Sequence, residues 1–171
     1  MSHMKVIQVD DVLYIGAFKN VVVTDIGGYV DFNHMQAVGR AYETLLQAYP
    51  RGVLALSFLR PGTPVSPADA RAEGARFVRE LGDSIIYSAM VIEGDGVLPQ
   101  MLRTVIRGIN VLARNSRIHV FGKGDEAIRH VAPLMARDDY ETDPIPELTV
   151  AVRAARTAFR PSRHVSLANH L

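Results

Sequence analysis

Apolar positions along the chain follow two different periods, and the alternation between them predicts strands followed by helices. The run Val53–Leu59 is apolar except for Ser57, which is typical of a strand buried on both faces. Further toward the amino terminus, Met35, Val38 and Tyr42 recur at helical spacing, with polar residues between them. The pattern therefore predicts short buried strands that alternate with amphipathic helices.

Turn residues divide the chain between these segments. Asp10 and Asp11 separate two strand-like runs and favour a hairpin, while Gly82 stops a helical run. Strands are expected at Lys5–Val9, Val12–Phe18, Val21–Ile26, Val53–Leu59, Ser84–Ile92 and Arg117–Phe121. Helices are expected after the cap residue Asp31, over Pro67–Leu81, from Leu98 to Leu112, from Asp125 to Met135 and over Leu148–Phe159.

This order predicts a single α/β domain with a mixed β-sheet, helices packed on it and a C-terminal helical extension. The 171 residues suit one domain, and the first residues resemble a cloning remnant, so we place the domain at residues 4–137. Residues 138–147 are expected to form an acidic linker that contains prolines, and residues 148–171 a helix with a flexible tail. That helix should have Val150, Ala154 and Phe159 on one side and dock through them on its own domain or on a second copy, which would form a homodimer through residues 148–160.

Three segments resemble parts of the STAS domain. Val21–Asp31 is similar to that family's passage from a strand into its first helix, Val53–Leu59 to its central strand, and His119–Ile128 to its last strand and helix start. The similarity spans about Lys5 to Met135, and the layout is also similar to the lipid-binding Sec14-like proteins. The resemblance implies a STAS-like, non-enzymatic, bacterial signalling module that binds a partner protein through the loop edge after the central strand.

The loop after the central strand departs from the STAS pattern. In that family it carries Asp-Ser-Ser/Thr-Gly, whose first hydroxyl residue is phosphorylated, whereas this chain has Arg60 to Ser66 there with Thr63 inside. Thr63 and Ser66 are the candidate acceptors, because two negative charges at a helix start would interact with the helix dipole. The alternative is that Ser66 caps the helix, with the carboxylate of Asp69 three residues on.

Candidate binding residues gather where strands end. The carboxyl ends of parallel strands meet at one edge of a sheet, where ligands commonly bind. The loops Arg60–Ser66, Glu93–Leu98 and Gly122–Asp125 should share that edge. The binding residues expected there are Arg60, Thr63, Ser66, Glu93, Asp95 and Lys123.

Two other interpretations of the same loops stay open. Ser66, Asp95 and Asp125 are residue types that commonly cap helices. An enzyme is the other alternative, with an acid–base site at Arg60, Glu93, Asp95 and Lys123. We assign no catalytic residue, because no third ligand or positioned histidine accompanies the carboxylates.

The composition of the chain disfavours several classes of partner and cofactor. A net charge of +1, from 19 basic and 18 acidic residues, supplies no large field for nucleic acid or an anionic membrane. The absence of cysteine excludes disulfides and thiolate metal sites, the six histidines are scattered, and no metal or other cofactor is expected. The apolar run Ile85–Ile92 is too short to cross a bilayer, so we expect a cytoplasmic protein. Its partner should be a protein, with a small apolar ligand or lipid as the alternative.

Overall fold

A six-stranded sheet forms the centre of the protein. The computed structural model describes residues 3–96, 99–100, 103, 118–136 and 143–161. The strands β1 (Lys5–Val9), β2 (Leu13–Phe18), β3 (Val21–Ile26), β4 (Val53–Leu59), β5 (Ile85–Ile92) and β6 (Ile118–Phe121) lie side by side in chain order. The pairs β1–β2 and β2–β3 are antiparallel, and the pairs from β3 to β6 are parallel. The predicted mixed sheet is confirmed.

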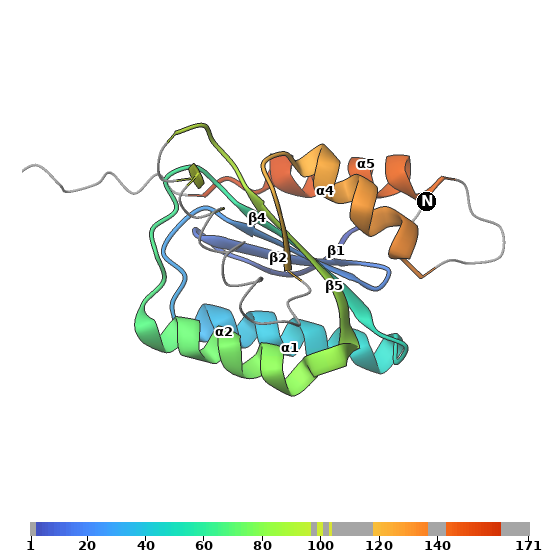
Figure 1. Ribbon diagram of the computed structural model, residues 1–171, viewed down its shortest axis with the longest axis horizontal. Helices are drawn as coiled ribbons and strands as arrows, with labels where there is room; N and C mark the ends of the chain where they lie inside the picture. Colours follow the sequence, from blue (N-terminus) through green and yellow to red (C-terminus); the bar gives the residue numbers. More distant parts are fainter. Residues whose placement is uncertain (1–2, 97–98, 101–102, 104–117, 137–142, 162–171) are drawn as a thin grey trace, which may run out of the picture.

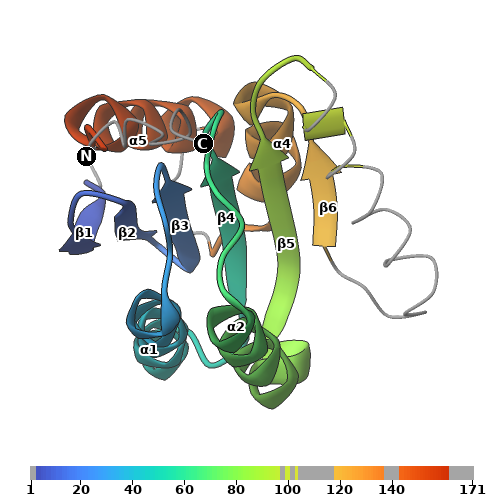
Figure 2. The same ribbon diagram turned by 90° about the vertical axis from the view of Figure 1, so that its left-hand side faces the viewer.

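Helices cover both faces of this sheet, which gives three layers (Figures 1 and 2). One face carries α1 (Phe32–Ala48) and α2 (Ala68–Leu81), and the other carries α4 (Gly124–Val131) and α5 (Pro144–Ala158). Short 3-10 turns at Gly82–Ser84 and Ala132–Leu134 follow α2 and α4. The helix expected from Leu98 to Leu112 lies largely outside the described residues.

The alternation of side chains along each strand decides which helical layer they reach. In β3, Val21 and Val23 pack in the core under α4 and α5, while Val22 packs in the core under α1 and α2. All three valines are fully buried. Because the period is two residues, Asp25 faces the same layer as Val23. A charged side chain is thereby directed toward α5.

A two-residue turn between β2 and β3 connects three parts of the fold. Lys19 adopts a φ of 52°, as the tight turns of hairpins require. Its ammonium lies 3.1 Å from the carboxylate of Glu147 in the first turn of α5. Asn20 donates to the carbonyl of Gly52 at 3.2 Å and accepts from the amide of Ala136 at 2.7 Å. The turn therefore holds the start of α5 against the sheet.

Two expected helix caps are wrong. The N-cap of α2 is Pro67, not Ser66, and no side chain caps this helix. The fixed φ of proline (here −63°) combined with an extended ψ of 164° makes Pro67 itself the last non-helical residue. Similarly, α4 begins at Gly124 after the N-cap Lys123, so Asp125 lies within its first turn.

The last helix begins four residues earlier than expected, at Pro144. Proline is tolerated in the first helical turn, where its missing N–H would have no partner in any case, and Asp143 caps the helix by accepting from the amide of Ile145 at 3.0 Å. Of the side expected to be buried, Phe159 is indeed buried, but Val150 is 68% exposed and Ala154 is exposed as well. The buried face consists of Leu148, Ala151, Val152 and Ala155, and it packs on the chain's own sheet.

We expect Asp31→Ala to weaken the fold in a pH-dependent way. Asp31 caps α1 by accepting from the amide of His34 at 3.0 Å, and this hydrogen bond is the main reason that the pKa of Asp31 lies below its ordinary value. Loss of such a cap costs about 1 kcal/mol of unfolding free energy at pH 7. A carboxyl with a lowered folded-state pKa stabilises above its unfolded pKa of about 3.9, and the gain disappears as the pH falls through the folded-state value.

Urea unfolding of the wild type and Asp31→Ala at pH 7 and at pH 2.5 measures this difference. The difference in unfolding free energy between the two proteins should be smaller at pH 2.5 than at pH 7. Asp31→Asn is the matched control, because asparagine also caps helices but does not titrate. A difference of equal size at both values of pH would show that the charge of Asp31 contributes nothing.

Candidate functional site at the carboxyl edge of the sheet

A buried carboxylate lies at the carboxyl end of β3. The side chain of Asp25 has no exposed surface. The Arg60 guanidinium donates to it twice, from Nε to Oδ1 at 2.9 Å and from Nη2 to Oδ2 at 2.7 Å. The Nε of Arg156 donates to Oδ2 at 3.0 Å. Since an unpaired buried charge is costly, the two arginines explain how a carboxylate is tolerated here.

Arg156 joins α5 to two further strands. It lies one helical turn after the buried Val152, so it faces the sheet. Its two terminal nitrogens donate to the carboxylate of Glu93, beyond β5, at 2.8 and 2.7 Å. The guanidinium also lies 4.2 Å from the ring centre of Phe58 in β4. Burial acts to lower the pKa of Arg156, but hydrogen bonding to Glu93 and the charge of Asp25 outweigh it and leave that pKa raised.

The Arg60 side chain fixes the end of α5. Its Nη2 donates to the backbone carbonyls of Arg156 at 3.0 Å and of Phe159 at 3.3 Å. Such carbonyls in the last turn have no partner within the helix. The guanidinium also stands 5.0 Å from the ring centre of Phe159. We refer to Asp25, Arg60, Glu93 and Arg156 as the arginine clamp, because together they hold α5 on the carboxyl edge.

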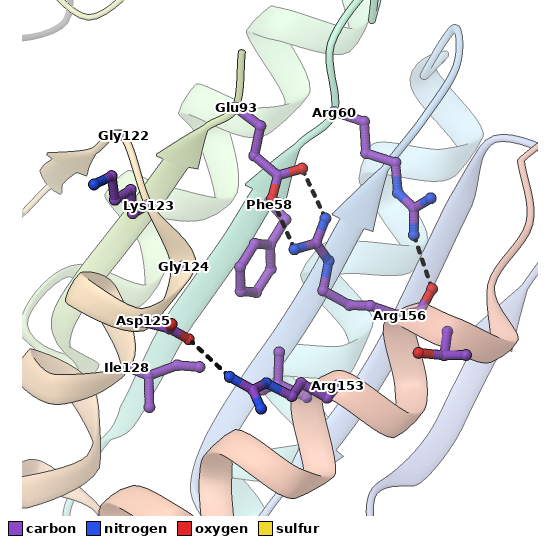
Figure 3. Close-up of a pocket in the computed structure, with 12 residues that line it drawn as sticks. Phe58, Arg60, Glu93, Gly122, Lys123, Gly124, Asp125, Ile128, Arg153 and Arg156 are labelled. Carbon is purple, nitrogen blue, oxygen red and sulfur yellow. Dashed lines mark hydrogen bonds and ion pairs between the residues drawn. The ribbon is translucent and has the colours of Figure 1, made fainter. Parts of the chain in front are cut away.

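A pocket of about 620 Å³ opens beside the arginine clamp, between α4, α5 and the ends of β4 and β5 (Figure 3). Its apolar lining comes from Phe58, Ile128 and Val152. A Cβ on Gly124 would lie 2.9 Å from the Phe58 ring, so glycine lets the first turn of α4 close on that ring. At the mouth, Arg153 lies 3.7 Å from Asp125, and their side chains are 71% and 63% exposed.

The structure brings together three of the six expected binding residues. Arg60, Glu93 and Lys123, one from each of the three loops, line this pocket. The other three, Thr63, Ser66 and Asp95, do not line it.

The remaining candidates have separate surroundings. The Thr63 hydroxyl lies 3.1 Å from the carbonyl of Ile26 and 2.8 Å from that of Arg60, so it shapes its own loop. Asp95 is exposed and Ser66 is half-buried. Phosphorylation of Thr63 or Ser66 stays a prediction.

The two carboxylates at this pocket are engaged by arginines. Both oxygens of Glu93 accept from Arg156, and Asp25 is shared by two arginines. Neither carboxylate therefore has an oxygen without a guanidinium partner, so neither is free to contact a ligand. Within the described residues, no group of three or more acidic or histidine side chains could hold a metal ion. By contrast, the Lys123 side chain is exposed at the pocket and available to a ligand.

Sequence reasoning missed four residues of this site, namely Asp25, Phe58, Arg153 and Arg156. One signal for Asp25 was present: a charged residue that follows Val21 and Val23 at a spacing of two must face a helical layer. Arg156 required the correct buried stripe of the last helix. That stripe places it one turn after Val152, and the expected stripe through Val150 placed it elsewhere.

Comparisons with known proteins find similarity to a solved structure. No protein-family profile matches the chain, and no curated protein matches it. A solved structure from Shewanella loihica PV-4 does match; it is described as an uncharacterized protein from the DUF3478 family with a SpoIIAA-like fold. It is 11% identical, the match covers 76% of this chain and 96% of that one, and the TM-score is 0.48.

The helices also bear on membrane insertion. None of those that the structure describes has the length and apolar content needed to span a bilayer.

We expect Asp25→Asn to lower the free energy of unfolding by about 3 kcal/mol, because it removes the charge that two half-buried arginines share. Glu80→Gln is the matched control: Glu80 is paired with Arg76, and both side chains are exposed. Such an exposed pair contributes less than about 1 kcal/mol to the free energy of unfolding. Urea unfolding at pH 7 measures both changes, and losses of equal size would contradict a stabilising role for the clamp.

Proposed function

We propose that this protein is a non-enzymatic regulatory module that binds a partner protein at the carboxyl edge of its sheet. The observation that supports this proposal most is that Arg60, Glu93 and Lys123, from three separate loops, line one pocket. The clamp holds the walls of this pocket in a fixed arrangement, and preorganised surfaces lose less entropy on binding. A STAS-like layout of strands and helices agrees with such a module.

The open form of the pocket favours a protein over a small ligand. Sites for small molecules usually bury 70–90% or more of the ligand. Here Arg153 and Asp125 at the mouth are mostly exposed, at 71% and 63%, so a small ligand would keep much contact with water. The loop that begins at Arg60 continues along the same edge to Val65, which is 63% exposed. A partner's surface could contact this loop and insert a side chain into the pocket.

Photo-crosslinking in the organism's own cells tests this proposal. A photoreactive residue at Val65 or at Lys123 should give the same discrete crosslinked protein, because both positions lie at the proposed surface. Glu43, which is exposed on α1, is the control position. It should give no such product.

Two results would contradict the proposal. Absence of a discrete product at both Val65 and Lys123 would show that this edge does not contact a partner protein. The same product in equal yield from Glu43 would show that the contact is not specific to this edge.

A further inference from the structure

Two cations at the mouth of the pocket are free to meet a ligand. Arg60 and Arg156 are held by Asp25 and Glu93 in the clamp. Among the described residues, Arg153 is paired only with Asp125, at 3.7 Å, and both side chains are exposed. Exposed pairs of this kind contribute little, so a ligand could separate them at small cost. Lys123 is exposed beside them.

The balance of charge favours an anion over a cation. Four lining side chains are basic, namely Arg60, Lys123, Arg153 and Arg156, and two are acidic, namely Glu93 and Asp125. Asp25 beneath them accounts for one more negative charge, which leaves the group one positive charge in excess. A carboxylate that enters the mouth would complete the pairing.

The base of the pocket is apolar. Phe58, Ile128 and Val152 line it, and each belongs to the core cluster between the sheet and the helices α4 and α5, so only the edges of these buried side chains reach the pocket. Figure 3 shows Phe58 and Ile128 on the pocket side of this core, with Arg153 across from Asp125. A ligand that fits both parts has an apolar group beside a carboxylate. In a protein, a leucine next to a glutamate provides this combination.

We propose that the pocket binds an acidic, apolar segment of the partner protein. Its carboxylates pair with Lys123 and Arg153 at the mouth, and an adjacent apolar side chain points toward the apolar base of the pocket. This inference rests on the proposed function and names the chemistry of the partner's contact. The same groups on a free fatty acid would find an open mouth that leaves much of the molecule in water.

Fluorescence anisotropy with labelled synthetic peptides tests the inference on the full chain. One peptide alternates leucine with glutamate, and the second replaces every glutamate with lysine. The acidic peptide should bind and the basic one should not. The double variant Lys123→Gln/Arg153→Gln should weaken acidic-peptide binding roughly fivefold to tenfold. Arg79→Gln/Arg129→Gln removes the same charge at exposed residues outside the pocket and should leave the affinity close to that of the wild type.

Each other outcome overturns the inference. Equal binding of the basic peptide would show that the charge of the pocket does not select its ligand. Equal weakening by the two double variants would place the acidic peptide on the general surface. Binding of decanoate but not of the acidic peptide would indicate a carrier of small apolar acids. If the acidic peptide fails while crosslinks at Val65 and Lys123 persist, the inference falls and the proposed function stands; if both fail, both fall.

Discussion

The buried carboxylate of Asp25 is the constraint on which the site depends. A charge with no exposed surface must be neutralised where it lies, and here Arg60 and Arg156 both donate to it. One arginine follows β4 and the other belongs to α5, so the two ion pairs join Asp25 to residues that lie 35 and 131 positions further along the chain. That charge draws both arginines together at the carboxyl edge, beside the contacts of Arg156 with Glu93 and the apolar burial of α5. The wall of the pocket formed by α5 thus depends in part on one aspartate in β3.

The helix α5 belongs to the fold as much as to the site. Its first turn is held by the ion pair between Lys19 and Glu147, and its last turn by the clamp. Between these ends, Leu148 and Val152 pack in the core of the sheet. Ion pairs at the two ends and apolar burial between them fix both the position and the rotation of the helix. This explains how Arg153 is presented to the pocket while Val152 faces inward.

Local rules predicted much of the fold. The strand β3 over Val21–Ile26 and the cap at Asp31 were predicted correctly, since β-branched runs and capping residues act through near neighbours. The convergence of Arg60, Glu93 and Lys123 followed from the geometry of parallel strands.

The rest depended on contacts that no local pattern shows. The link between Asp25 and Arg156 spans 131 residues of sequence. The stripe of α5 was misassigned because Val150 is apolar yet exposed, while small alanines complete the buried face. Ser66 has the right chemistry for a cap, but Pro67, the residue after it, is the last non-helical residue and takes the cap position.

The native-state hydrogen exchange of α5 measures the clamp most directly. The amides of Val152 and Ala155 should be protected nearly as well as those of β4. The Arg156→Gln variant should reduce protection in α5 far more than in α1. Rapid exchange of α5 in the wild type, or an equal loss of protection in α1, would contradict the view that the clamp holds this helix.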